Sequence, residues 1–385
     1  MERNRPVLTG ITLSLVGFGS SFAVVLAGLQ SVGADAGQAA SGLIVLCLAQ
    51  AFGMLWLARR HRRPLTLAWS TPGAALLVSA GVPDGGWPAA VGAFALVGLM
   101  VLITGLWPWL GRLVAAIPAQ VAQAMLAGVL VSLCLAPVEG MVSDPLWTLP
   151  LVMLWLGLLR WAPAWSAPAV FAAALIMIAA DAPWGRMEAA QTVPRLELVI
   201  PELTSGALLG IALPLYLVTM ASQNVPGAAV ISSYGYKVPW RSSLGVTGAG
   251  TLLGSFFGGH GINLAAITAA MGASSEAHED PSQRWRATWA AGWTYLVLAG
   301  LAAALVLLAA QARPGLLETV AGLALLTTLG AAMSAATAEA RGRVPAAATF
   351  LIAASGVTVL GIGAAFWALL GGLVLWAALV RRPAP

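Results

Sequence analysis

Long apolar stretches alternate with short polar connections along the whole chain, and the apolar stretches form two sets of seven. The first set lies at about 8–30, 37–58, 66–82, 87–106, 119–138, 147–160 and 165–181. The second set follows a polar stretch (182–202) and lies at about 203–224, 243–257, 262–274, 288–310, 315–336, 345–359 and 361–380. Because about 20 apolar residues cross a bilayer as a helix, the pattern predicts an all-α polytopic membrane protein with 14 transmembrane segments.

Two of these stretches are short and interrupted, and they occupy matching places in the two halves. Residues 65–78, in the third segment, contain Pro72 and Gly73, and residues 258–271, in the tenth, begin with three glycines within four positions. Each leaves about ten residues for a helix, or about 15 Å, which is half of a hydrocarbon core. A single break of this kind is more often a kink. Two at matching positions predict a pair of half-helices at the binding site of a secondary transporter.

The positions of the basic residues predict the orientation in the membrane. With both termini in the cytoplasm, only Arg186, Arg195 and Arg313 fall outside, and the other 16 of the 19 basic residues fall inside. This asymmetry is the one that cytoplasmic loops show. With seven segments per half, residues 1–181 and 203–385 form two inverted repeats, joined by a periplasmic loop at 182–202.

Composition excludes the other broad classes. The chain is 59% hydrophobic and 9% charged, whereas about a quarter of a soluble domain is charged. The net charge of +5 comes from clusters between apolar spans, which argues against nucleic-acid binding. The sequence lacks the common phosphate-binding, hydrolase, zinc-protease and Cys-x-x-Cys motifs, so we expect no enzyme, cofactor or metal.

The residues at the two breaks suit an anion site. Ser70 or Thr71 can cap a helix that begins at Pro72, and Asn263 can cap one in the tenth segment. Both helix N-termini then point at the bilayer midplane from opposite sides, with free N–H groups and partial positive charge. We therefore predict that a carboxylate binds between them. The candidate substrate-binding residues at the breaks are Ser70, Thr71, Pro72, Gly73, Gly261, Ile262, Asn263 and Leu264.

Further polar residues interrupt the first segment and the eighth, its partner in the repeat. Ser20 and Ser21 can bind substrate, or equally can bond to carbonyl groups of their own helix. For Ser222, Gln223 and Asn224 we favour contact with substrate or half-helix, because burying an amide without partners costs several kcal/mol.

Three residues are candidates for proton coupling. His260 is a histidine at the midplane, and imidazole changes charge in the physiological pH range. The alternative is a histidine that bonds to loop backbone in an outer vestibule. Glu139 and Glu318 lie toward the outer ends of the fifth and twelfth segments, where each is either a protonatable gate or an ordinary interfacial carboxylate.

Four stretches resemble motifs of the benzoate–proton symporter family (BenE type). RPLTLAWSTPGAALL (63–77) resembles its third-segment motif, and MASQNVPGAAV (220–230) its eighth. NLAAITAA (263–270), followed by EAHEDP (276–281), resembles its tenth segment and the loop after it, and GIGAAFW (361–367) its last span. Together these motifs are distributed over nearly the whole chain.

The resemblance implies a bacterial inner-membrane importer of benzoate or a similar aromatic carboxylate, coupled to protons. It implies the seven-plus-seven fold of nucleobase and anion carriers, with a core domain (segments 1–4 and 8–11) that moves against a gate domain (segments 5–7 and 12–14). A homodimer through the gate domain belongs to the same expectation. Nucleobase carriers have glutamates where this chain has Ser222-Gln223 and 264–266, and that loss suits an anionic substrate. The alternative is an uncoupled or exchange carrier of other small organic anions or nucleobase-like substrates.

Overall fold

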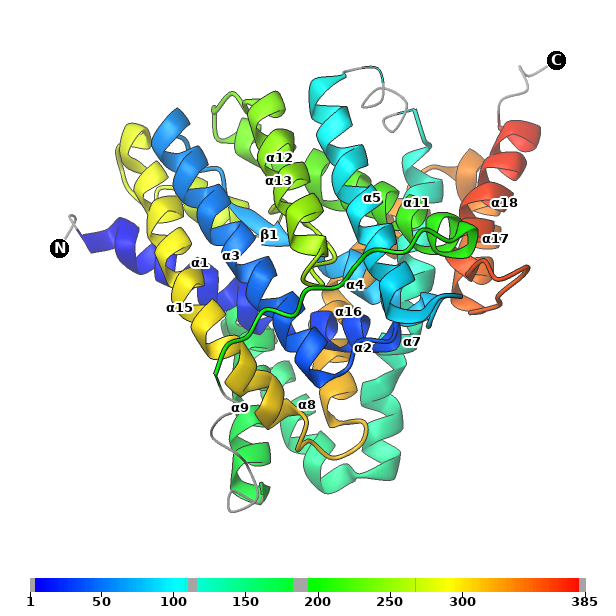
Figure 1. The fold of residues 1–385 in the computed structure, drawn as a ribbon, viewed down its shortest axis with the longest axis horizontal. Coiled ribbons are helices and arrows are strands. Elements are labelled where there is room, and N and C mark those ends of the chain that lie inside the picture. The colour runs from blue at the N-terminus through cyan, green and yellow to red at the C-terminus, as the bar shows by residue number, and fades with distance from the viewer. Residues whose placement is uncertain (1–3, 108, 110–115, 183–192, 267, 381–385) are drawn as a thin grey trace.

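The computed structural model describes residues 4–107, 109, 116–182, 193–266 and 268–380 (Figure 1). In chain order its helices and strands are α1 (Arg5–Gly19), α2 (Phe22–Ser31), α3 (Ala36–His61), β1 (Leu67–Trp69), α4 (Thr71–Ala80), α5 (Gly86–Leu106), α7 (Ala119–Ser143), α8 (Pro145–Trp161), α9 (Pro163–Asp181), α10 (Ser205–Ala207), α11 (Leu213–Thr219), α12 (Val225–Ser233), α13 (Trp240–Ser255), β2 (Ile262–Leu264), α14 (Thr268–Ala273), α15 (Trp285–Ala309), α16 (Leu316–Ala336), α17 (Arg343–Ala354) and α18 (Ala364–Leu379). A helix lies in every predicted apolar window, which confirms the all-α membrane class.

Helix length separates the apolar segments into two kinds. Within the described residues, 8 helical segments are long and apolar enough to cross a membrane, and α4, α8 and α18 are shorter apolar helices. The first long segment is divided at Ser20 and Ser21, because α1 ends at Gly19 and α2 begins at Phe22. The total of 14 crossings stays a prediction.

The sequence at the ends of α3 explains its exact placement. Asp35 accepts a hydrogen bond from the Gln38 backbone N–H, and the Gln38 side chain accepts one from the Asp35 N–H, which forms a capping box. At the other end Arg62 adopts a left-handed conformation (φ 48°), and the last turn is basic. Positive side chains there complement the partial negative charge of a helix C-terminus.

Small residues allow the central helices to pack closely. A Cβ atom at Gly98 on α5 would lie 2.6 Å from the Leu252 Cα on α13. A Cβ at Gly248 on α13 would lie 2.7 Å from the Leu102 Cα on α5. Glycines of this kind let membrane helices approach to backbone contact. The α5–α13 pair and the α3–α15 pair, together with α1, α2 and α4, make up one region of the molecule.

The other region is built around α7, which packs against α16 and α17. In Figure 1, α17 and α18 lie side by side at the edge opposite α1 and α15. The division resembles the expected core and gate domains, and their movement relative to one another stays a prediction.

The two broken segments meet in a two-stranded antiparallel sheet. Leu67 pairs with Leu264, Ala68 with Asn263 and Trp69 with Ile262. The strand pairing provides hydrogen bonds for backbone N–H and C=O groups that lie outside any helix. Non-helical backbone within the membrane requires such partners. The helix predicted to begin near Asn263 begins instead at Thr268 in the described residues, so the expectation that Asn263 caps it is wrong. Asn263 is held in a strand because its backbone pairs with the third segment.

The end of the predicted 182–202 loop is an extended segment bound to the surface of the helices. Glu197 N–H donates to the Ser41 hydroxyl (2.9 Å), Val199 N–H to the Phe256 carbonyl (2.8 Å), and Glu202 N–H to the Pro88 carbonyl (2.9 Å). Figure 1 shows this segment as a green trace that passes α3, the end of α13 and α5. Residues 183–192 of the predicted loop lie outside the described residues.

Candidate functional site

The site is built around the first turn of the short helix α4 (Thr71–Ala80). Ser70 occupies the N-cap position, and its carbonyl accepts the Ala74 N–H (2.8 Å). Its hydroxyl makes no cap bond and instead bonds to the Thr219 hydroxyl of α11 (2.7 Å). The expected side-chain cap by Ser70 or Thr71 is therefore wrong. Within the described residues, the N–H groups of Thr71 and Gly73 have no acceptor, and Pro72 has no N–H to offer. Such a helix N-terminus can bind an anion.

Strand β2 is held in place by buried polar side chains. The Asn224 side-chain oxygen accepts the Leu264 N–H (2.9 Å), and the Thr251 hydroxyl accepts the Ile262 N–H (3.0 Å). The Asn263 amide, oriented so that both its ends are satisfied, accepts the Ser70 N–H (3.1 Å) and donates to the Leu264 carbonyl (2.9 Å). Asn224 thus contacts the tenth segment, which is one of the two roles expected for it. All these groups build the site.

Gln223 is the amide that remains available. It is 9% exposed, and its side chain makes no hydrogen bond within the part of the chain that the structure describes. It lies in a π-helical turn, Met220–Asn224, that interrupts the eighth segment. Such turns occur frequently at functional sites. The neighbouring Ser222 hydroxyl donates to the Val218 carbonyl of its own helix (2.5 Å), so of these two residues Gln223 is the better candidate for contact with a ligand.

The two serines of the first segment bond to their own helix, as one of their two predicted roles requires. Ser20 and Ser21 both donate to the Gly17 carbonyl, at 3.3 and 2.8 Å. The Ser21 hydroxyl also accepts the indole N–H of Trp69 (2.7 Å), which connects the bend of the first segment to β1.

His260 is fully buried against the N-cap of α4. Its Nε2 atom lies 3.0 Å from the Ser70 carbonyl oxygen, and its Nδ1 atom has no partner within the described residues. The ring packs edge-on against Phe94. The histidine therefore bonds to backbone, as the alternative required, but it does so inside the protein. By contrast, Glu139 and Glu318 are exposed and make no ion pair in the described ranges.

Sequence reasoning missed Tyr295 on α15, which is 2% exposed. Its hydroxyl makes no hydrogen bond in the described part of the chain and points at the end of α1. A Cβ atom at Gly17 would lie 2.9 Å from the Tyr295 hydroxyl oxygen and 3.7 Å from the Thr268 Cγ2. A buried tyrosine hydroxyl usually finds a partner. A tyrosine inside an otherwise apolar span was the signal that could have identified it.

The central residues are packed against one another in this structure. Ser70, Asn224, His260 and Asn263 are each 0% exposed. Two surface cavities, of about 670 and about 520 Å³, are lined by other residues. The site therefore combines a free helix N-terminus, one available amide and one half-bonded histidine, without a wide opening.

Comparison with known proteins identifies relatives over nearly the full length of the chain. The family model described as benzoate membrane transport protein (BenE) matches residues 3–378. The inner membrane protein YdcO of Escherichia coli (strain K12) is 36% identical over 97% of this chain and 95% of its own length. The benzoate membrane transport protein of Acinetobacter baylyi (strain ATCC 33305 / BD413 / ADP1) is 27% identical over 98% of this chain and 95% of its own length.

Solved structures show the same fold at low sequence identity. The transmembrane domain of the cyanobacterial bicarbonate transporter BicA aligns with a TM-score of 0.59 at 17% identity, covering 97% of this chain and 98% of that one. SLC26A9 aligns with a TM-score of 0.61 at 11% identity, covering 98% of this chain and 65% of that one. The fold is thus the seven-plus-seven inverted-repeat fold of these transporters. The family match shows that the protein is a membrane transporter and not an enzyme. The chain belongs to the benzoate membrane transport protein (BenE) family.

Proposed function

We propose that this chain imports benzoate or a related aromatic carboxylate across the bacterial inner membrane, by proton symport with alternating access. The observation that carries the proposal is the first turn of α4, where Thr71 and Gly73 have N–H groups without an acceptor in the described residues. These donors lie beside the β1–β2 pair, which closes off the backbone on that side. The name of the Acinetobacter relative supports the choice of substrate.

The charge of the substrate explains why a proton would accompany it. A helix N-terminus offers only about half a positive charge, so a carboxylate in a low-dielectric site is incompletely neutralised. A proton taken up with the anion makes the moving unit neutral. We propose that the helices around α3, α5, α13 and α15 then move as the core against the α7 group, with both termini in the cytoplasm and a homodimer through the gate.

Uptake by the purified protein in liposomes tests the function. Benzoate added outside should be taken up together with protons, so that the liposome lumen acidifies. Benzamide, which has nearly the same shape without the charge, should compete poorly. Equal competition by benzamide would contradict carboxylate recognition. Benzoate uptake without acidification would favour the uncoupled or exchange carrier.

Replacing His260 with glutamine should separate binding from coupling. The glutamine amide can still donate to the Ser70 carbonyl, so benzoate binding and benzoate–benzoate exchange should persist. An amide cannot carry a proton, so the ratio of inside to outside benzoate concentration should fall toward 1. In a carrier coupled to one proton per benzoate, this ratio rises about tenfold for each pH unit of gradient. Flow dialysis and counterflow in liposomes measure the two properties.

The matched control is His278→Gln, in the loop after the tenth segment. This variant should accumulate benzoate as the parent does. Undiminished accumulation by His260→Gln would assign the proton to another group, or to benzoate itself.

A further inference from the structure

A large groove runs along the outer face of the protein between α1 and α15. It has a volume of about 670 Å³. Among the residues that line it are Val7, Ile11, Trp285, Arg286, Trp289 and Trp293. None of these residues belongs to the central site, and the predicted orientation places the Trp285 end at the cytoplasmic interface.

The shape of the groove follows from how the two helices pack. A Cβ atom at Gly10 on α1 would lie 2.7 Å from the Ala290 Cβ, so the two helices come into backbone contact there. The tryptophans at 285, 289 and 293 are four residues apart and therefore share one face of α15. Trp289 and Trp293 are 36% and 51% exposed, and their rings meet edge-on at 5.7 Å between centroids. The tryptophans thus line one side of the groove, next to the point where α1 and α15 come into backbone contact.

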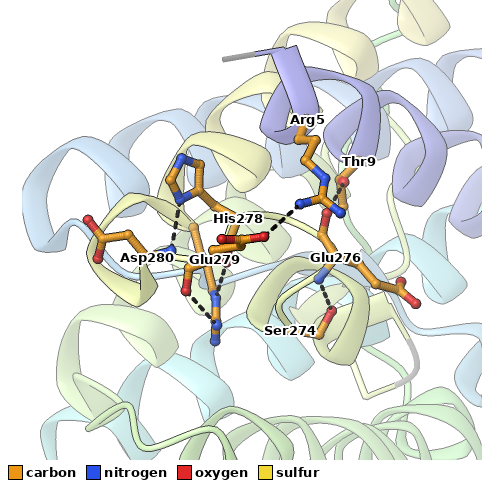
Figure 2. Close-up of polar contacts among 8 residues, drawn as sticks. Arg5, Thr9, Ser274, Glu276, His278, Glu279 and Asp280 are labelled. Carbon is orange, nitrogen blue, oxygen red and sulfur yellow. Dashed lines mark hydrogen bonds and ion pairs between the residues drawn. The ribbon is translucent and has the colours of Figure 1, made fainter. Parts of the chain in front are cut away.

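The loop after the tenth segment is bonded to α1 near this end of the groove (Figure 2). Arg5 pairs with Glu279 at 3.5 Å, and the Thr9 hydroxyl donates to the Glu276 carbonyl at 3.2 Å. Arg284 is buried and donates to the carbonyls of Ala273 (2.7 Å) and His278 (2.8 Å). Two of the three arginines at this end are therefore already bonded.

Arg286 is the cation that remains available in the groove. It is exposed and forms no ion pair in the described residues, and its guanidinium lies 6.0 Å from the centre of the Trp285 ring. The acids at this end are Glu276, Glu279 and Asp280. Of these, Glu279 is engaged by Arg5, and the Asp280 carboxylate accepts the Ser282 N–H (2.8 Å) and hydroxyl (2.7 Å). An anionic group that reaches the groove from the interface thus meets an unpaired guanidinium.

We propose that this groove binds one anionic phospholipid of the cytoplasmic leaflet, with its phosphate at Arg286 and an acyl chain along Trp289 and Trp293. The face is surrounded by bilayer, so a concave apolar surface there is filled by lipid chains. From Trp285 to Val297 the helix rises about 18 Å, which matches the roughly 15 Å depth of one leaflet. Tryptophan and arginine together are typical of the interface region.

Quenching of tryptophan fluorescence by brominated lipids tests the site. The full-length protein is reconstituted with dibrominated phosphatidylglycerol or dibrominated phosphatidylcholine, and the Trp289→Phe/Trp293→Phe double variant is subtracted to isolate the groove signal. The groove signal should show about a fivefold preference for the anionic lipid. Arg286→Gln should abolish the preference, and Arg286→Lys should retain it.

The control variant is Arg241→Gln, an exposed arginine at the start of α13, which should keep the preference unchanged. Equal quenching of the parent's groove signal by the two lipids would overturn the proposal. A preference that survives in Arg286→Gln would overturn the assignment of the phosphate to this residue.

Discussion

Replacing Gly28 with alanine is expected to destabilise the protein and to abolish benzoate uptake. Gly28 lies on α2 where the short helix α4 packs against it. A Cβ atom there would lie 3.0 Å from the Ala74 carbonyl carbon and closer still to its oxygen. The α4 backbone has little room to yield, because Ser70 ties its start to α11 and β1 ties the preceding residues to β2. Overpacking of this kind costs about 1–3 kcal/mol of unfolding free energy.

Thermal unfolding in detergent and uptake in liposomes measure the two effects. The matched control is Gly300→Ala on α15, where a Cβ atom would meet nothing within 4 Å. In a helix interior, alanine is more favourable than glycine by about 1 kcal/mol. The control should therefore be at least as stable as the parent. Equal stability of Gly28→Ala and Gly300→Ala would show that α4 can move away from α2 without loss.

Replacing Gln223 with leucine is expected to weaken benzoate binding about 10- to 100-fold without lowering the melting temperature. The Gln223 amide has no bonding partner in the described residues, so its removal costs the protein itself no hydrogen bond. A hydrogen bond to a charged ligand contributes about 1.5–3 kcal/mol, and each 1.4 kcal/mol corresponds to a factor of ten in the dissociation constant. A loss of affinity without a loss of thermal stability distinguishes a ligand contact from a structural role.

Isothermal titration of the solubilised protein with benzoate measures the dissociation constant, and a thermal melt measures stability. Gln30→Leu provides the same chemical change at an exposed position at the end of α2, and it should leave the affinity unchanged. Unaltered affinity in Gln223→Leu would remove Gln223 from the site. A lower melting temperature would give the amide a structural role.

Local pattern alone was sufficient to determine the class of the protein and the position of its unusual segments. A long hydrophobic stretch indicates a membrane span directly. In the hydrocarbon core of the bilayer, side chains must be mostly apolar and backbone N–H and C=O groups must be hydrogen-bonded within the protein. The same logic located the beginning of α4 beside Pro72, because proline acts on the turn in which it lies. It also gave bonding to their own helix as one of the two roles of Ser20 and Ser21.

The contacts between segments were decided by the tertiary structure. Asn263 is a good helix cap by its chemistry, yet it lies in a strand because Ala68, almost two hundred positions earlier, offers backbone groups to pair with. In the same way, the Ser70 hydroxyl bonds to the Thr219 hydroxyl and does not cap its own helix. His260 bonds to the Ser70 carbonyl through its Nε2 atom. The tendency of a residue to cap a helix depends on its neighbours in the sequence. These bonds, by contrast, form only because the two inverted halves bring residues distant in sequence to the same depth in the membrane. For that reason the sequence located the two breaks, and only the fold determined how they join.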